Sequence, residues 1–514
     1  MSVDDALRLA RDHLARGAFG EASRIAEQVA EQKRGSADAF HIMAVSAFRA
    51  GRLDKAIVHA ERATARAPKT SAFWSNLAEM LRRRGFIERG LSAARRSLTL
   101  DPRNAQGWNT LGILEFERRN FAEAERACRR ALDIDPSAAS SWNNLGNALC
   151  RLERDAEAHE AYARAISSRP AYYEAMVNDA LCWREEADFA RATARLDEAL
   201  VASPRNANAH LCRAIVSFLK GETAQGRIEY EWRLALPRAV PRALPGKAWR
   251  GEEIAGRRIF VFAEQGLGDT IQSLRYLRRL LERRVASISF LAPRNLRNLV
   301  ARNFPEIDVA TRMPEAGTVD YHCALMSLPL LLDGPAGTIS PGTAYLTAEP
   351  ERVAAWRERL APFRGRKIGL VWAGNGTYQN DHNRSMRAQM FAPLLEVAGC
   401  HFFGLQIGPA GAQVSALKPG VQDLGDRVSN MSETAAAIAA LDLVISVDTS
   451  LAHLAGALGT PVWTLLPHVP DWRWGMEGKA HPLYGFMRLF RQKTRRDWAG
   501  VIADVRMALD RGEA

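Results

Sequence analysis

Three features are missing from this sequence of 514 residues, and each absence excludes a class of protein. No apolar run approaches the roughly 18 residues that a membrane-spanning helix needs. The amino terminus, MSVDDALRLARDHLARG, is charged and lacks the apolar core of a signal peptide. The six cysteines include no CxxC pair, so their spacing supports neither a zinc site nor a disulfide framework; they are Cys128, Cys150, Cys182, Cys212, Cys323 and Cys400. We therefore expect a cytoplasmic protein.

The excess of positive charge is divided between the two parts of the chain. Charged residues make up 25% and hydrophobic residues 47%, which is typical of folded protein, and the length requires more than one hydrophobic core. The net charge of +12 divides into +5 for residues 1–240 and +7 for the remainder. Such a spread is typical of solvated surfaces, so we do not expect nucleic-acid binding.

A 34-residue period runs through the first part of the chain. Pro68, Pro102, Pro136, Pro170 and Pro204 keep this interval, as do Trp74, Trp108 and Trp142. This is the period of the tetratricopeptide repeat, a pair of packed helices. The phase predicts units that start near residues 3, 37, 71, 105, 139, 173 and 207. We expect them to stack into an α solenoid with a concave groove over residues 1–236.

One position of the repeat carries a polar side chain in four consecutive units. These side chains are Asn76, Thr110, Asn144 and Asn178, all expected on the first helix of a pair. Two interpretations remain open. The side chains form local hydrogen bonds within the repeats, or they line the groove and bind the backbone of an extended acceptor peptide.

The second part of the chain shows the pattern of two Rossmann-like domains. Residues 237–250 contain three prolines and form a connector. Strands followed by glycine-rich turns occur at residues 258–272 and 367–376, which predicts one domain over 251–349 and another over 350–490, each offering its loops to a common cleft. Residues 491–514 form an amphipathic helix.

Residues 441–466 are the centre of the second domain. The sequence LDLVISVDTSLAHLAGALGTPVWTLL is typical of a strand, a turn, a small-residue helix and a second strand. Thr449 or Ser450 can cap the helix, which leaves unpaired amides at its start, from Leu451 onward, directed out of the sheet. An anionic group fits there, although an ordinary capped helix would show the same pattern.

Three motifs, GLGDTIQ, VWAGN with NDHNRS, and DTSLAH, together resemble the glycosyltransferases of the heptosyltransferase type, family 9. More closely, the chain is similar to bacterial proteins that fuse such a transferase to tetratricopeptide repeats, some of which glycosylate flagellin. The resemblance implies a GT-B fold, with two Rossmann-like domains facing a cleft. In such GT-B proteins the terminal helix often returns to the first domain.

The resemblance also implies roles for particular residues. Asp269 matches the aspartate thought to deprotonate the acceptor hydroxyl, with Glu264 as the alternative base, and a simple helix cap is the competing explanation of Asp269. Gly268 brings the backbone close to the ligand. Asp448 would contact the donor sugar or order its loop. The diphosphate would be held by Thr449, Ser450, Leu451, Ala452 and His453.

Further donor contacts are expected from the loops that follow two other strands. Arg384 is the best candidate for a phosphate clamp, because a guanidinium binds phosphate oxygens in pairs. Asn375 is a candidate sugar ligand from the same polar loop, which would otherwise be only a solvated loop. Gln406 lies where the nucleotide base sits in similar enzymes. Trp472 and Trp474 either pack internally or wall the pocket.

These expectations combine into one functional prediction with alternatives. No DxD pair stands at a strand end, so we expect a metal-independent, inverting transfer without a cofactor, from a CMP-, UDP- or GDP-linked sugar. The acceptor would be a Ser or Thr hydroxyl of a protein, with flagellin as the leading candidate. The alternatives are transfer to lipopolysaccharide or another saccharide, and a binding scaffold whose transferase half is inactive.

Overall fold

The chain divides into two compact units, which are described separately. The computed structural model describes residues 2–33, 36–237, 240–241, 243–337, 342–378, 380–428 and 430–513. The first unit is Met1–Arg205 and the second is Asn206–Ala514. Within the described ranges, no helix has both the length and the apolar character that crossing a bilayer requires.

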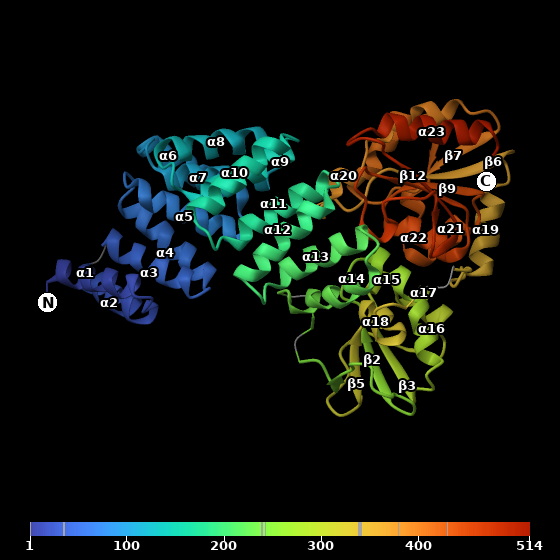
Figure 1. Ribbon diagram of the computed structural model, residues 1–514, viewed down its shortest axis with the longest axis horizontal. Helices are drawn as coiled ribbons and strands as arrows, with labels where there is room; N and C mark the ends of the chain where they lie inside the picture. The colour runs from blue at the N-terminus through green and yellow to red at the C-terminus, as the bar shows by residue number, and fades with distance from the viewer. Residues whose placement is uncertain are drawn as a thin grey trace. The chain divides into compact units, whose positions relative to one another are not determined.

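The first unit is a stack of helix pairs (Figure 1), as the repeat period predicts. The first helix of each pair begins at the predicted residue. The pairs are α1 (Val3–Ala15) with α2 (Phe19–Gln32), α3 (Ala37–Arg49) with α4 (Leu53–Arg66), α5 (Ser71–Arg84) with α6 (Ile87–Leu100), α7 (Ala105–Glu117) with α8 (Phe121–Ile134), α9 (Ala139–Arg151) with α10 (Asp155–Ser168), and α11 (Tyr173–Glu185) with α12 (Phe189–Ala202).

Small residues let the two helices of a pair pack closely. A Cβ atom on Gly146 of α9 would lie 2.6 Å from the Tyr162 ring of α10, and one on Gly112 of α7 would lie 2.7 Å from Cys128 Sγ of α8. The first helices of successive pairs also contact one another. They therefore form one continuous layer of the solenoid.

The second unit begins with one more helix pair, α13 (Ala207–Leu219) and α14 (Thr223–Tyr230), followed by the short helix η1 (Glu231–Ala235). The repeat phase predicts the start of α13 at 207, but this pair groups with the α/β part of the chain. Arg233 of η1 explains part of this grouping. Its fully buried guanidinium bonds Glu264 Oε1 and Ser327 Oγ, both at 2.8 Å, and so ties η1 to the first sheet.

The first lobe of the second unit is a five-stranded parallel sheet in the order β1-β5-β2-β3-β4. The predicted connector contributes β1, although its residues 238, 239 and 242 lie outside the described part of the chain. The elements are β1 (Lys247–Ala248), β2 (Arg258–Phe262), α15 (Leu267–Ser273), α16 (Arg275–Leu281), β3 (Ser287–Leu291), η2 (Arg294–Leu296), α17 (Arg297–Asn303), β4 (Asp308–Ala310), β5 (Tyr321–Ala324), η3 (Leu325–Ser327) and α18 (Leu328–Asp333).

The second lobe is a seven-stranded sheet in the order β11-β12-β10-β9-β6-β7-β8, parallel except for the β11-β12 pair. Its elements are α19 (Pro350–Leu360), β6 (Arg366–Val371), α20 (Asp381–Arg384), η4 (Ala388–Glu396), β7 (Cys400–Gly404), η5 (Pro409–Leu417), β8 (Val421–Asp423), η6 (Gly425–Arg427), α21 (Met431–Ala439), β9 (Leu443–Val447), α22 (Ser450–Leu458), β10 (Val462–Leu466), η7 (Trp472–Trp474), β11 (Ala480–His481), β12 (Tyr484–Arg491) and α23 (Trp498–Asp510). Two parallel sheets with covering helices are consistent with the predicted GT-B fold.

The terminal helix α23 does not brace the first lobe, which corrects the expectation taken from similar proteins. Trp498, Ile502 and Val505 are buried in one cluster with Leu370 of β6 and Trp463 of β10. The apolar face of α23 therefore covers the second sheet, because that sheet supplies the hydrophobic surface it needs.

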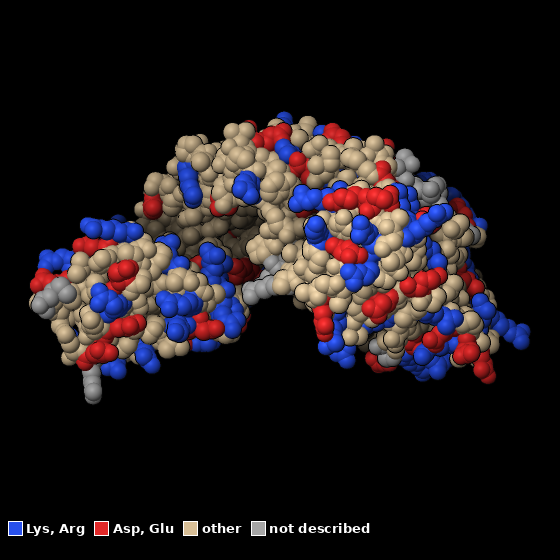
Figure 2. Space-filling model, turned by 90° about the horizontal axis from the view of Figure 1, so that it is seen from below, with Lys and Arg blue, Asp and Glu red and all other residues tan. Residues whose placement is uncertain are grey.

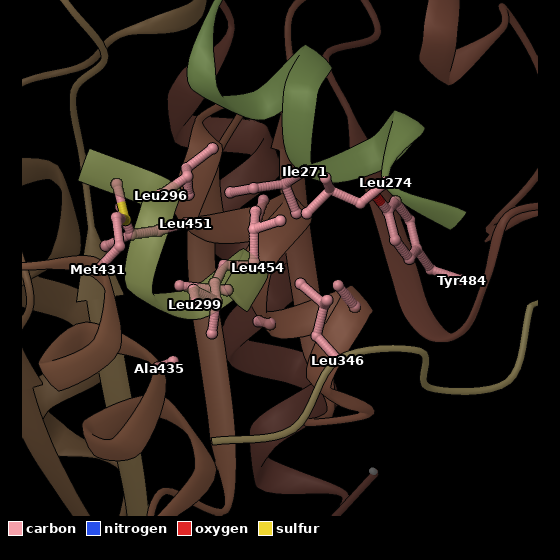
Figure 3. Packing of buried hydrophobic residues seen from close by; sticks show 14 of the residues in the cluster. Ile271, Leu274, Leu296, Leu299, Leu346, Met431, Ala435, Leu451, Leu454 and Tyr484 are labelled. Atoms are coloured by element: carbon pink, nitrogen blue, oxygen red, sulfur yellow. The ribbon is translucent and has the colours of Figure 1, made fainter. Parts of the chain in front are cut away.

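A single hydrophobic cluster joins the two lobes within the second unit. Figure 3 shows Ile271 and Leu274, at α15, beside Leu454 of α22 and Tyr484 of β12. Helix α15 packs directly on α22. The glycine-rich turn of the first lobe is thereby held against the start of the α22 helix.

Charged side chains of both signs are mixed over the visible surface. In Figure 2, blue Lys and Arg atoms are interspersed with red Asp and Glu atoms over the face shown. A nucleic-acid surface would instead gather basic residues into one stripe or patch. The face shown carries no such stripe or patch.

Candidate functional site

The centre of the site is the start of α22, where the chain leaves the buried strand β9. Thr449 has extended backbone angles and caps the helix, and its Oγ1 accepts a hydrogen bond from Leu451 N at 3.3 Å. Ser446 Oγ lies 3.0 Å from the same Oγ1 and fixes its orientation. Gly459 ends the helix with a φ of 78°, in the left-handed region that glycine tolerates.

The start of α22 opens into a cavity of about 1590 Å³. Both lobes and the α13–α14 pair line this cavity. Typical small-ligand sites measure roughly 300–1,000 Å³, so the volume allows for two substrates. Most residues predicted for the donor and the reaction line it: Gly268, Asp269, Asn375, Arg384, Gln406, Asp448, Thr449, Ser450, Leu451 and His453.

Asp269 faces this cavity from the third position of α15. Its Oδ2 accepts a hydrogen bond from Gly266 N at 3.0 Å, so it does cap the helix. Its Oδ1 is free of that role and lies 2.5 Å from Arg473 Nη2. Burial raises the pKa of Asp269 above its usual range, Arg473 lowers it and Asp471 raises it. The same carboxylate can therefore cap the helix with one oxygen and still serve as the candidate base with the other.

Gly268 lies where the first lobe contacts the first turn of α22. A Cβ atom at this position would lie 2.8 Å from His453 Cδ2 and 3.5 Å from Ser450 Cα. Because real Cβ atoms do not approach other atoms to 2.8 Å, the contact requires glycine. Asp269, the next residue, is thereby placed beside the first turn of α22.

Arg473 is a charged site residue that sequence reasoning missed, as it missed Asp471, Tyr230, Leu211 and Ile215. It is 8% exposed and forms ion pairs with Asp269 of the first lobe and with Asp471 at 2.6 Å. Its guanidinium carbon also lies 4.4 Å from the Trp472 ring centroid. The two neighbouring tryptophans drew attention in the sequence, whereas nothing in the spacing indicated that the arginine between them reaches another domain.

Arg384 is placed in the cavity by its own helix and by a glycine. Its Nε lies 3.2 Å from Asp381 Oδ1, and its guanidinium carbon lies 4.6 Å from the Tyr378 ring centroid. A Cβ atom on Gly374 would lie 2.6 Å from Arg384 Nη2. Gly374 therefore provides the space in which the guanidinium lies. The Arg384 side chain is 19% exposed there.

Asn375 and Gln406 line the cavity but use their amides within the protein. Asn375 Oδ1 accepts from Thr377 N and Oγ1 and shapes the loop. Gln406 Oε1 accepts from the amides of Trp372 and Ala373, and its Nε2 donates to the carbonyls of Ala373 and Ile407. The Gln406 side chain therefore holds the loop after β6, and it is only 6% exposed.

Asp448 is a second buried carboxyl of the cavity with a raised pKa. It is 7% exposed, and burial together with the nearby Asp471 raises its pKa to about 6, against the opposing effect of Arg384. A carboxyl with this pKa changes its protonation state near neutral pH. It can therefore accept a hydrogen bond from a sugar hydroxyl or donate one.

His453 and Ala452 are further from solvent than predicted. His453 is 4% exposed, its Nδ1 lies 3.0 Å from Tyr484 OH, and burial lowers its pKa, so the ring is neutral. Ala452 is fully buried and does not line the cavity. Only the backbone of Ala452 remains a candidate for contact with a ligand.

Glu264 lies outside the cavity lining, which corrects its assignment as the alternative base. Its side chain is 1% exposed, and its Oε1 bonds Arg233 and the amide of Met326. Burial raises its pKa, and Arg233 opposes that shift. Glu264 anchors η1 to the first sheet and cannot reach an acceptor in this structure.

Part of the cavity wall is apolar and aromatic. Leu211 and Ile215, one turn apart on α13, line it together with Tyr230 and Trp472. Trp472 stacks on Phe218 of α13 with ring centroids 4.2 Å apart. Trp474 is instead buried against His453. Of the two predicted tryptophans, one walls the pocket and the other packs.

The polar side chains predicted at one position of four repeats make hydrogen-bonding contacts to other residues of the solenoid. Asn144 Nδ2 donates to Asn109 Oδ1, and Asn178 Nδ2 donates to Asn143 Oδ1, each at 2.9 Å and each to the preceding repeat. Asn76 Nδ2 lies 2.6 Å from His41 Nε2. All three amides are half-buried and keep some exposed surface.

Thr110 departs from that group, which corrects its assignment as an acceptor residue. It is fully buried, and its hydroxyl accepts a hydrogen bond from Gln106 Nε2 at 3.3 Å. A hydroxyl without exposed surface cannot bind a peptide in the groove.

Comparisons with known proteins agree with both parts of this architecture. A model of the tetratricopeptide repeat matches residues 43–105, 75–139 and 109–173. A model of glycosyltransferase family 9 (heptosyltransferase) matches residues 427–480, which include α22 and its flanking strands. Together they support a fusion of tetratricopeptide repeats with a glycosyltransferase.

One curated relative and two solved structures add to these matches. Protein FlbA of Caulobacter vibrioides is 29% identical over 366 residues, covering 62% of this chain and 60% of the relative, so the chain spans about three fifths of that protein. The structure of the APC/C hetero-tetramer Cut9-Hcn1 is 20% identical, with 42% of this chain and 43% of that chain covered and a TM-score of 0.40. A tetratricopeptide repeat protein from Parabacteroides merdae is 16% identical, with 45% and 91% covered and a TM-score of 0.39. At these scores neither structure bears on function.

Proposed function

We propose that this chain transfers a sugar from a nucleotide-activated donor to a Ser or Thr hydroxyl of a protein. One observation carries the proposal. A single cavity contains the amino-terminal end of α22, the guanidinium of Arg384 and the carboxylate of Asp269, contributed by the two lobes. Anion binding and proton abstraction are the two tasks that such a transfer requires.

The donor phosphates belong at the start of α22. The first-turn amides and the helix dipole favour a negative charge there, and Arg384 adds a bidentate cation. These groups would also stabilise the charge that develops on the leaving nucleotide. Asp448, next to the cap, would then contact a hydroxyl of the donor sugar.

The acceptor hydroxyl would be activated by Asp269. In an inverting single displacement, the acceptor oxygen bonds to the anomeric carbon, the bond from that carbon to the phosphate oxygen breaks, and Asp269 Oδ1 takes the acceptor proton. Such general-base catalysis contributes about 10²–10⁴-fold. Arg473 favours the ionised form of Asp269, and the form that accepts a proton is the ionised one.

A protein acceptor is supported by the repeats and by the apolar wall. Three tetratricopeptide matches lie in the first unit, and the wall of the cavity comes from α13, which keeps the repeat phase. Leu211 and Ile215 would contact apolar side chains next to the modified residue. From the resemblance to repeat-containing transferases, flagellin is the first acceptor to test.

Intact-mass spectrometry tests the acceptor. Flagellin would be purified from cells with and without this chain, and from cells that carry Asp269→Asn. We expect a sugar-sized mass increase only with the unaltered chain. An unchanged mass rejects flagellin, whereas an equal mass increase with Asp269→Asn removes Asp269 from the mechanism.

Nucleotide release tests the chemistry and identifies the donor. The full chain would be incubated with CMP-, UDP- and GDP-linked sugars together with flagellin, and with a saccharide acceptor in a parallel series. One donor should be consumed, at the same rate with and without added Mg²⁺. Transfer to the saccharide alone would support the alternative acceptor, and consumption of none of these donors would contradict a transferase of this type.

A further inference from the structure

Five side chains with metal-binding atoms gather within the first unit, and none of them lines the cavity described above. They come from α9, α10 and the end of α11, that is, from two adjacent repeats (Figure 1). One set of three is Cys150, Asp155 and Cys182, and the other is His159, Cys182 and Glu186. Within each set the donor atoms lie within 4.8 Å of one another, and Cys182 belongs to both.

The chemistry of these donors fits one ion in particular. Two thiolates, one imidazole and a carboxylate form a donor set that zinc binds with tetrahedral geometry. With zinc bonds of about 2.0–2.3 Å, tetrahedral donors lie roughly 3.3–3.8 Å apart. Cys182 Sγ and Asp155 Oδ1 are already 3.6 Å apart. Cys150 and His159 belong to different sets, so their donor atoms do not lie within 4.8 Å of each other, and side-chain rotation must bring them together before one ion can bind both.

His159 is oriented as metal-binding histidines usually are. Its Nδ1 lies 2.5 Å from Asp179 Oδ1, which leaves Nε2 directed toward Glu186 Oε1 at 2.6 Å. Asp179 is itself 2% exposed and held by Arg195 Nε at 2.7 Å. The His159 ring stacks on Trp183 with centroids 3.5 Å apart. A buried carboxylate on the far ring nitrogen is the typical outer contact of a zinc-bound histidine.

The free thiols and their access to solvent also fit a metal site. Cys150 and Cys182 are both free cysteines. Cys182 is fully buried, whereas Cys150, Asp155, His159 and Glu186 are half-buried. An ion can therefore enter from solvent and meet a thiol at the bottom of the site.

We propose that Cys150, Cys182 and Nε2 of His159, with Asp155 or Glu186 as the fourth ligand, bind one zinc ion. The ion displaces the protons of both thiols and the proton shared between His159 and Glu186. It links α9 and α10 of one repeat to α11 of the next, so it fixes the angle between two repeats of the solenoid.

Metal analysis of the full chain tests this site without reference to activity. The protein would be purified under reducing conditions, loaded with zinc, and measured by elemental analysis and by competition with a chromophoric chelator. We expect about one zinc per chain. With cobalt in place of zinc, the tetrahedral visible bands and a thiolate-to-cobalt charge-transfer band should appear.

Variants identify the ligands. Cys182→Ser, Cys150→Ser and His159→Gln should each weaken zinc binding at least tenfold, and Asp179→Asn should weaken it about 10–100-fold by releasing the ring. Cys128→Ser is the matched control, because Cys128 is also fully buried in the solenoid and belongs to neither set. Circular dichroism would confirm that each variant is folded.

Two results would overturn the proposal. One is zinc affinity that is unchanged in both Cys150→Ser and Cys182→Ser, since Cys150→Ser changes a half-buried side chain and should fold. The other is a reduced, folded chain that takes up no zinc or cobalt. This result would count against the site even if mass spectrometry had found a Cys150–Cys182 disulfide before the reduction.

Discussion

At the scale of single residues, the site depends on how Arg473 is shared between two carboxylates. Asp269 lies in the first lobe and Asp471 in the second, and the same guanidinium bonds both. Arg473 is nearly buried, so neither ion pair is strongly screened by water. Loss of this arginine would leave two partly buried carboxylates without their cation.

Arg473→Met should therefore shift the pH dependence of the reaction. Arg473 lowers the pKa of Asp269, and its removal should raise that pKa by roughly one to three units. Because the ionised form accepts the proton, the acid limb of kcat/KM should move to higher pH. Arg488→Met is the control, since Arg488 pairs with Glu513 away from the cavity. A pH profile that is unchanged in Arg473→Met would show that this arginine does not act on the base.

Asp448 should make the stability of the chain depend on pH. Its pKa is raised to about 6 in the folded state, so between about pH 4 and 6 the folded state holds a proton that the unfolded state has lost. Stability should therefore fall as pH rises through this window and level off above it. The difference in unfolding free energy between the unaltered chain and Asp448→Asn, measured by urea unfolding, should change by about 3 kcal/mol at most. A constant difference from pH 4 to 7 would contradict the raised pKa.

At the scale of elements, the decisive contact is between α15 and α22. Figure 3 shows their apolar side chains in one cluster, and Gly268 lies directly against His453 and Ser450. The two helices therefore set the distance between the candidate base and the anion site. A change in their spacing should affect transfer more than it affects overall stability.

Gly268→Ala tests this spacing. The new Cβ atom would lie 2.8 Å from His453 Cδ2, and overpacking of this kind costs about 1–3 kcal/mol. We expect a much lower kcat with the fold retained by circular dichroism. Gly20→Ala is the control, because a Cβ atom on Gly20 meets nothing within 4 Å. Normal kcat in Gly268→Ala would mean that the lobes separate during catalysis.

At the scale of the whole molecule, the two units suggest separate roles, acceptor recruitment for the solenoid and donor chemistry for the second unit. The solenoid has its own helix layers, and the second unit contains both lobes and the cavity. The grouping of α13 and α14 with the second unit places the cut for a truncation after Arg205. A cut at residue 236 would remove the wall formed by Leu211, Ile215 and Tyr230.

Removal of residues 1–205 should separate acceptor recruitment from donor chemistry. We expect the shortened chain to retain nucleotide binding and to lose modification of a protein acceptor, because the remaining unit contains the cavity lining. Calorimetry would measure the first property and intact mass the second. Undiminished modification of the protein would show that the repeats are not needed for its recruitment.

The regular parts of this molecule could be predicted from the sequence, because they repeat a local rule. The repeat period placed the start of every first helix, and apolar runs marked β2, β6, β9 and β10. Strand β12 was missed, because YGFMRLFR mixes apolar and basic residues and has no clear alternation.

Pairings between distant residues could not be predicted. Arg473 and Asp269 lie in different lobes, and Cys150 and Cys182 lie in different repeats. Gln406 has the right position for a ligand contact, but its side-chain amide forms hydrogen bonds with the backbone of the loop after β6. Local patterns place a residue on an element, whereas the partner of a polar atom is decided by packing.

Calorimetric titration of the full chain with UDP, GDP and CMP tests the central claim most directly. The account predicts that one of these nucleotides binds saturably, and that Arg384→Ala weakens it about 10–100-fold, as expected for a lost charge-assisted bond of about 1.5–3 kcal/mol. Binding of none of them at millimolar concentration, or equal binding to Arg384→Ala, would contradict a nucleotide-sugar site at the start of α22.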